Sequence, residues 1–148
     1  LLFGETSVAY RELVLEKRLA QRLSAGFRFS RDPGLWTVSA QVTGEQNIAP
    51  VREAIDQAVA RIQENPPTAK DLDDLKRRTR YGFLMGMDTP DRVAGGLARY
   101  IALSGGIESV DALFTAMTQV TPEDIQAAAR KYLTPDRRTV AVLKGVQS

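Results

Sequence analysis

The sequence predicts an α+β fold in which helices pack on one face of an antiparallel sheet. Three observations lead to this prediction. A helical apolar period between Val8 and Leu23 gives way to a period of two over Trp36–Val42. Several segments with helical period and clear start and stop signals follow. A last apolar alternation covers residues 139–143, and this order of elements is typical of a layered α+β domain.

The first predicted helix begins at Thr6 or Ser7, because a hydroxyl oxygen there accepts a hydrogen bond from an otherwise free backbone N–H. Gly26 follows the helical pattern as a stop signal. The apolar residues in between recur at spacings of seven and four, which predicts one buried helical face: Val8, Leu15, Leu19 and Leu23.

A β-hairpin is predicted next, with residues 25–29 paired to residues 36–42. Apolar and polar residues alternate in its second strand, as in a half-buried strand, and we interpret Trp36 as part of the core. Between the strands, Pro33 presets φ and Gly34 tolerates a positive φ. This pair therefore predicts a turn.

The later helices are predicted mainly from their ends. Pro50 suits a first helical turn, Thr68 and Asp71 resemble a capping box, and "DTP" and "TPED" at residues 88–90 and 121–124 are further start signals. Five helices are predicted in this part of the chain, and each has one buried apolar face. In chain order, the residues of the five faces are Val51, Ile55, Ala58, Val59, Ile62; Leu72, Leu75, Phe83; Val93, Leu97, Tyr100, Ile101; Val110, Leu113, Phe114, Met117; and Ile125, Ala128, Ala129, Tyr132.

Two features of this later part need a further explanation. Gly95 and Gly96 lie inside a predicted helix, where each glycine costs about 1 kcal/mol relative to alanine. We expect a neighbouring backbone to approach them closely. Residues 139–143 would add a third strand, which still makes a thin sheet, so we expect further strands in a longer parent protein.

Composition limits the possible functions. The 148 residues fit one domain, with 20 Lys and Arg against 18 Asp and Glu, so no excess of positive charge indicates nucleic-acid binding. No apolar run approaches the ~20 residues that span a membrane. The chain starts with "LLFG" rather than a methionine or a signal peptide, and we interpret residues 1–148 as a single-domain fragment of a longer protein.

Residue types exclude several kinds of chemistry. With no histidine and no cysteine, the chain lacks the usual zinc ligands and the usual bases for a serine or cysteine nucleophile, so Ser24 has no partner that would activate it. The missing cysteines also exclude disulfides and leave the redox compartment open. We therefore assign no catalytic, cofactor-binding or metal-ligating residue.

Charged and glycine-rich clusters have simpler explanations. Asp71, Asp73 and Asp74 match no calcium loop and favour the first turn of a helix. The run "KRRTR" at residues 76–80 spreads around a helix and fits a solvated face with ion pairs to those acids. "SGGIES" at residues 104–109 follows no strand and lacks the lysine of a phosphate loop.

Four motifs together resemble the later part of a pitrilysin/insulinase-type zinc metallopeptidase domain, a fold shared with mitochondrial-processing-peptidase-like proteins. They are the glycine–serine opening before "YRELV", the "DPGLW" turn and strand, the "PPTAKDLDDLK" helix start and the closing "VTPEDIQAAARKYLTP". The resemblance covers nearly the whole chain. It implies an α+β half-domain of the non-catalytic kind.

The resemblance also implies partners. In this family, homologous domains close around a chamber, and one of them carries a His-x-x-Glu-His motif whose zinc activates water. The companion domain lacks the motif and forms chamber wall. The expected partners are therefore a homologous catalytic domain, with zinc bound there, and a peptide substrate, and the expected location is a bacterial cell envelope or periplasm.

Many non-catalytic domains of this family supply an Arg and, seven residues later, a Tyr that assist at the scissile carbonyl. An ungapped alignment puts Val14 and Gln21 at these positions, and a shifted register puts Arg22 and Phe29 there. Neither register gives a complete pair. The segment is expected to be scaffold, and an assisting role for Gln21 or Arg22 stays open.

Two alternatives remain from the sequence. The domain could be purely structural, like core subunits of respiratory complexes with this fold, or it could be an unrelated α+β binding module. Peptides often bind such folds as an added strand, but the sequence does not show which edge of the hairpin is free.

Overall fold

The computed structural model describes residues 1–27, 30–32 and 34–145. Within these residues, helices surround one two-stranded antiparallel sheet, which confirms the predicted α+β class. No helix in the described ranges has the length and apolar character needed to cross a bilayer.

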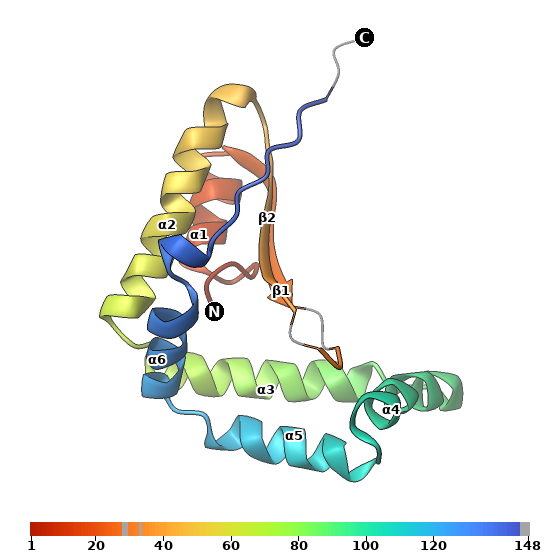
Figure 1. The fold of residues 1–148 in the computed structure, drawn as a ribbon. Helices are drawn as coiled ribbons and strands as arrows, with labels where there is room; N and C mark the ends of the chain where they lie inside the picture. Colours follow the sequence, from red (N-terminus) through yellow and green to blue (C-terminus); the bar gives the residue numbers. More distant parts are fainter. Residues whose placement is uncertain (28–29, 33, 146–148) are drawn as a thin grey trace.

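The sheet and its covering helices form one layered body (Figure 1). β1 (Ala20–Phe27) pairs with β2 (Trp36–Val42). α1 (Val8–Tyr10) and α2 (Ile48–Glu64) lie on one side of this hairpin. The core lies between them and consists of Phe3, Ala9, Leu13, Ala20, Leu23, Val51 and Ala58.

The first helical segment ends earlier than predicted. Ser7 caps it as expected, since its side chain accepts a hydrogen bond from the Tyr10 N–H at 3.1 Å. The helix then widens into the π-helix η1 (Arg11–Glu16), and Arg18 stops it with a left-handed backbone at φ 52°. The prediction of a helix through Leu23 is therefore wrong, because β1 already begins at Ala20.

A β-bulge explains why the apolar pattern was misleading. Ala20 pairs with Val42 and Arg22 with Gln41, so Gln21 is an extra residue in β1. The bulge lets Ala20 and Leu23 both face the core although they are three residues apart, a helical spacing within a strand.

Other predictions about this region change accordingly. The expected core residues Val8 and Leu15 are 63% and 60% exposed, while Leu13 is buried. Gly26, the predicted helix stop, lies inside β1.

The hairpin itself is confirmed, but with a longer first strand. β2 has the predicted bounds, whereas β1 begins at Ala20 instead of residue 25. The predicted strand end at Phe29 and the turn residue Pro33 lie outside the described residues. The prediction that Trp36 is part of the core is wrong: the residue is 38% exposed, although its ring centroid lies 5.9 Å from that of the buried Phe3.

The later helices begin where their caps predict. Thr68 and Thr89 cap α3 (Ala69–Met85) and α4 (Pro90–Ser104). Asn65 is the C-cap residue of α2. The remaining helices are α5 (Glu108–Gln119) and α6 (Pro122–Tyr132), and short 3₁₀ turns η2 (Glu45–Asn47) and η3 (Pro135–Arg137) complete the described elements.

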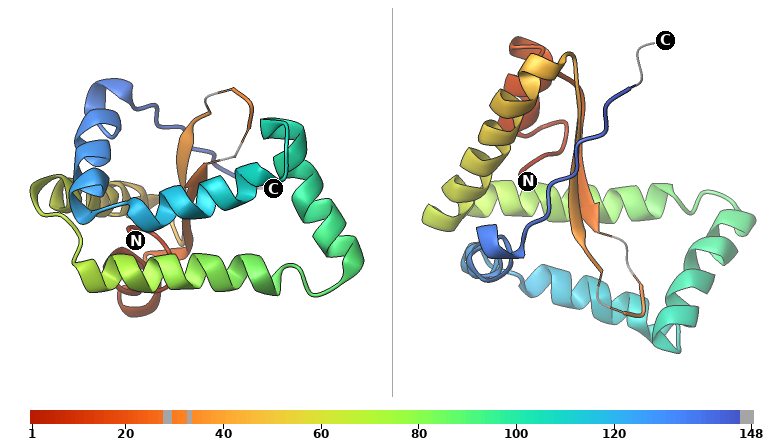
Figure 2. Two further views of the ribbon diagram at one scale, coloured as in Figure 1. Left: turned by 90° about the horizontal axis from the view of Figure 1, so that it is seen from below. Right: turned by 45° about the horizontal axis from the view of Figure 1, so that its top comes forward.

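α3, α4 and α5 form an open frame beside the hairpin (Figures 1 and 2). α3 and α5 lie alongside each other, and α4 crosses at their far end. Phe83 of α3 joins the three helices, because its ring contacts those of Tyr100 at 6.0 Å and Phe114 at 4.8 Å. No residue of α4 is fully buried.

Several residues of this frame and of α6 that were predicted to be buried are exposed. Ile101, Leu113 and Tyr132 are 41%, 40% and 57% exposed, and Ala128 is also on the surface. A Cβ added at Gly95 would meet nothing within 4 Å, and one at Gly96 would meet only Met87 Cε, at 3.5 Å. The predicted close backbone approach is thus wrong, because no backbone atom of another described segment lies within 4 Å of either added Cβ.

Reciprocal side-chain caps fasten α6 to α2. The Gln63 amide donates to the carbonyls of Ala129 at 3.1 Å and Leu133 at 2.9 Å. The Gln126 amide donates back to the carbonyls of Gln63 at 3.1 Å and Glu64 at 2.9 Å. The carbonyls of Leu133, Gln63 and Glu64 thereby obtain partners from the other helix, while the Ala129 carbonyl also accepts from the Leu133 N–H at 3.0 Å.

The predicted last strand is absent. Residues 139–143 form neither strand nor helix in the structure, although their sequence alternates as a strand does. A strand requires a neighbour to pair with, and the described residues supply none to this segment.

Candidate functional site

The family alignment places its Arg and Tyr at Val14 and Gln21. These two residues lie on either side of Arg18, whose backbone is left-handed. Val14 sits in η1, half-buried and packed against the core cluster. Its apolar side chain offers no hydrogen bond. The residue at the position of the family's Arg is therefore a packing residue here.

Gln21 and Arg22 lie together at the bulge of β1, and both are exposed. Among the described residues, neither the Gln21 amide nor the Arg22 guanidinium has a hydrogen-bond partner, so both groups are available to a ligand. Phe29, which the shifted register pairs with Arg22, lies outside the described residues. Sequence reasoning missed the bulge, and the signal for it was the three-residue spacing of Ala20 and Leu23.

One face of the hairpin is polar along its length. The cross-strand pairs on this face are Arg22 with Gln41, Ser24 with Ser39, and Gly26 with Thr37, and all six residues are exposed. The opposite face carries Leu23 and the half-buried Val38 and Ala40, which pack on the core.

This polar face can bind but has no group for acid–base chemistry. Its side chains are hydroxyls, one amide and one guanidinium, and it carries no carboxylate or imidazole. Ser24 has no base beside it on the face. The arrangement suits hydrogen bonding to a peptide backbone.

The acidic start of α3 does not form a metal site. Asp71 accepts a hydrogen bond from Thr68 Oγ1 at 2.6 Å, and Asp74 pairs with Lys70 at 2.7 Å and Arg77 at 2.8 Å. The hydrogen bond from Lys70 is the main cause that lowers the pKa of the Asp74 carboxyl. These carboxylates serve a cap and ion pairs, and no group of metal-binding residues is found in the described ranges. The residues present do not fit a zinc ion.

The basic side chains of residues 76–78 in α3 bind to separate partners. Lys76 Nζ donates to the carbonyls of Thr118 at 2.9 Å and Val120 at 2.7 Å and so caps the end of α5. Arg78 donates to the Thr6 hydroxyl at 2.6 Å. Together with the Arg77–Asp74 pair, these contacts show that the run does not converge on one ligand.

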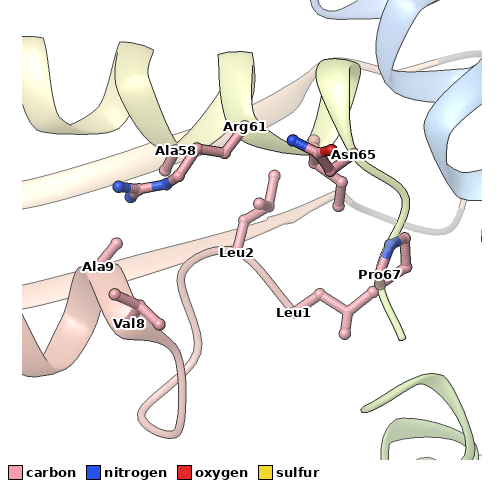
Figure 3. Close-up of a pocket in the computed structure, with 9 residues that line it drawn as sticks. Leu1, Leu2, Val8, Ala9, Ala58, Arg61, Asn65 and Pro67 are labelled. Atoms are coloured by element: carbon pink, nitrogen blue, oxygen red, sulfur yellow. The ribbon is translucent and has the colours of Figure 1, made fainter. Parts of the chain in front are cut away.

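A pocket of about 320 Å³ lies where the first residues cross α1 and α2 (Figure 3). Its polar side chains are Arg61 of α2 and Asn65, the residue that follows α2, and it contains no carboxylate or hydroxyl side chain. It therefore lacks a nucleophile and a general base. The apolar lining consists of Leu1, Leu2, Val8, Ala9, Ala58, Ile62 and Pro67.

Comparison with a family model gives a match over residues 1–79. That model is described as the peptidase M16 inactive domain. The match includes the first helical segment, the bulged hairpin, α2 and much of α3. It confirms the family resemblance drawn from the sequence.

Two solved structures share the fold. A protease from Helicobacter pylori is 18% identical with a TM-score of 0.79, and the peptidase M16 inactive domain from Pseudomonas fluorescens is 20% identical with a TM-score of 0.73. In each case the match covers 90% of this chain and 32% of the other chain. The chain thus spans about a third of the length of each. No curated protein sequence matches it.

Proposed function

The chain belongs to the peptidase M16 inactive-domain family, and from this we propose that it is the non-catalytic domain of a zinc-dependent metallopeptidase. In this role it packs against a homologous catalytic domain and forms part of the wall of the chamber in which peptides are hydrolysed. Zinc and the His-x-x-Glu-His motif belong to that partner.

The observation that carries this proposal is the family match together with the chemistry of the residues. The chain has no histidine or cysteine, and its acidic cluster is occupied by caps and ion pairs. A domain of this family with these residues has to obtain its chemistry from a neighbour.

The polar face of the hairpin supports the wall role. Ser24, Ser39 and Thr37 offer hydroxyl donors and acceptors on an exposed face of the hairpin. Such groups bind the backbone of an extended peptide and make few demands on its side chains. Arg22 adds one positive charge at the end of this face that is nearest to the bulge.

Peptide cleavage tests the proposal directly. A quenched fluorescent peptide is incubated with this chain, with a complex of the chain and a catalytic domain bearing the zinc motif, and with that complex plus a chelator. We expect no cleavage, cleavage, and loss of cleavage, in that order. Cleavage by the chain alone would contradict the proposal, and equal cleavage by the catalytic domain with and without the chain would favour a purely structural domain.

The Gln21 amide can be tested in the same complex. If it hydrogen-bonds the reacting carbonyl, Gln21→Ala lowers kcat by a factor of about 10² with a smaller change in KM, since a lost transition-state donor has an effect of that order. Gln57→Ala, which removes an exposed amide on α2 away from the polar face, is the matched control. Unchanged turnover in the Gln21→Ala variant would show that the Gln21 amide does not assist the reaction and that the residue is part of the scaffold.

A further inference from the structure

The cross-strand pair of Arg22 and Gln41 ends the polar face of the hairpin, next to the bulge of β1. Both residues are exposed, and they lie directly opposite each other in the ladder. Directly opposed side chains in an antiparallel pair have Cβ atoms about 4.5–5.5 Å apart. The guanidinium of Arg22 and the amide of Gln41 can therefore bind the same small group.

The bulge decides on which face Arg22 lies. In a regular strand every second residue faces the core, so buried residues are an even number of positions apart. Ala20 and Leu23 are both buried, with exposed fractions of 2% and 3%, and the extra residue Gln21 accounts for their odd spacing. Without the bulge, Arg22 would share the face of Ala20 and be directed toward the core.

No acidic side chain in the described ranges neutralises Arg22. It takes part in none of the ion pairs found there, and neither its guanidinium nor the Gln41 amide has a hydrogen-bond partner among these residues. Glu12, in the helical segment before β1, is paired with Lys17 at 2.5 Å. The other side chains of the polar face are neutral, so its one charge is left for a ligand.

Given the proposed peptidase role, on which this inference rests, we propose that Arg22 and Gln41 form a subsite for a carboxylate side chain of the peptide substrate. The assembled peptidase then prefers Asp or Glu at one substrate position. A guanidinium presents two parallel N–H groups to the two oxygens of a carboxylate, and the single charges balance. A phosphate group carries nearly two negative charges, and the polar face supplies one cation.

The neighbouring serine pair indicates where the acidic residue lies along the peptide. Ser24 and Ser39 are the next pair on the same face, about 7 Å from Arg22 and Gln41 at 3.3–3.4 Å per residue. Side chains on one face of an extended peptide are spaced in the same way. The acidic residue is therefore expected two positions from a small or polar residue that contacts the serines.

Quenched fluorescent peptides that differ at one position test the subsite. Glutamate, glutamine or lysine is placed at each position in turn, and kcat/KM is measured with the complex of this chain and the catalytic domain. At one position we expect the glutamate peptide to be cleaved about tenfold more efficiently than the glutamine peptide, mainly through a lower KM, because a hydrogen bond between two charged groups is lost in the glutamine peptide. The lysine peptide is expected to be the poorest substrate there.

Substitutions at Arg22 test the role of its charge. Arg22→Gln is expected to abolish the preference for glutamate, and Arg22→Lys to reduce it, because lysine lacks the planar fork. Arg22→Glu is expected to reverse the preference in favour of the lysine peptide, which a purely structural role would not cause. Arg52→Gln, at an exposed arginine of α2 without a partner in the described residues, is the matched control and is expected to keep the parent's preference.

Direct binding separates a failure of the subsite from a failure of the proposed function. The glutamate and glutamine peptides are titrated into this chain alone, and NMR follows the backbone amides of residues 20–24 and 39–41. We expect the glutamate peptide to bind about tenfold more tightly, and Arg22→Gln to remove this difference. A complex that cleaves no peptide would contradict the proposed function, whereas this difference in binding would still support the subsite.

Three results would overturn the subsite. Equal cleavage and equal binding of the glutamate, glutamine and lysine peptides at every position would remove it and leave the proposed function intact. An equal loss of kcat for all peptides in Arg22→Gln would place the guanidinium at the reacting carbonyl instead. Tighter binding of a phosphoserine peptide than of the glutamate peptide would make a phosphate group the ligand.

Discussion

Residues 1–64 and the frame of α3, α4 and α5 are stabilised in different ways. All members of the core cluster lie in the first region, where Phe3 and Leu13 are almost completely buried. In the frame, the fully buried side chains are Leu72 and Val110, in different helices. The first region is therefore stabilised by a shared core, and the frame depends on contacts between pairs of side chains and on capped helix ends.

The caps of the frame illustrate the second kind of stabilisation. Thr68 and Thr89 satisfy the starts of α3 and α4, and Lys76 satisfies the end of α5. Each cap is worth about 1 kcal/mol and acts over a few residues. Local capping signals are therefore sufficient to fix where a helix begins and ends in a region without a shared core. Packing into a shared core can override such signals.

The largest expected effect separates the two regions with one kind of substitution. Leu13→Ala removes a side chain that is 1% exposed and is expected to lower the free energy of unfolding by about 2–5 kcal/mol. Leu97→Ala in α4 removes a half-buried side chain and is expected to lower it by about 1 kcal/mol. Urea denaturation followed by circular dichroism measures both.

Equal losses in the two leucine variants would contradict the comparison. They would mean that the frame has a core as effective as that of residues 1–64. A matched Leu15→Ala variant, at a residue 60% exposed, serves as the surface control and is expected to change stability by less than about 0.5 kcal/mol.

The next effect concerns the contact between the first region and α6. Gln63→Ala leaves the Leu133 carbonyl without its donor and removes one of the two donors to the Ala129 carbonyl, and it is expected to destabilise the protein by about 1–2 kcal/mol. Gln126→Ala acts on the other end of the same contact, so the double variant is expected to lose less than the sum. Fully additive losses in urea would show that the two caps act independently.

Arg18 offers a smaller and stabilising change. Its φ of 52° costs an L-residue about 1–2 kcal/mol, and a glycine avoids this at an entropic cost of about 0.5–1 kcal/mol. Arg18→Gly is thus expected to raise the thermal midpoint slightly. Lys17→Gly, at the right-handed neighbour with φ −82°, is the control and is expected to lower it.

The smallest expected effect is a pH dependence in α6. Hydrogen bonds from the Thr121 backbone N–H and hydroxyl lower the pKa of the Asp124 carboxyl below 3.8. The ionised carboxylate therefore stabilises the helix above that value, and the contribution is lost as the pH falls through the folded-state pKa. Asp124→Asn is expected to flatten the loss of helical signal in an acid titration below about pH 4.

The accuracy of the sequence predictions follows the same division. The starts of α3, α4 and α6 were predicted because hydroxyl caps and prolines act locally. The end of the first helix was not, because Arg18 takes a left-handed conformation that its side chain does not indicate and the bulge at Gln21 gives β1 a helical spacing. The exposure of apolar side chains in the frame was also not predicted. Helical periodicity identifies an apolar face, but it does not indicate whether another element covers that face.

For the candidate site, the sequence indicated the family, the positions Val14 and Gln21, and the lack of zinc ligands. It could not indicate that Val14 packs inward while Gln21 protrudes from a bulge, because that depends on the register of β1 against β2. The extent of residues 1–148 as a single domain remains a prediction.

The sequence by itself determined the family, the helix caps, the hairpin and the absence of histidine and cysteine, because each of these depends on residue type or on contacts a few positions apart. The tertiary structure decided where the first helix ends, which apolar faces are covered, and that residues 139–143 lack a neighbour. These features depend on contacts between segments far apart in the chain. An apolar pattern indicates that one face of a segment has to be buried, but it does not identify the segment that covers it.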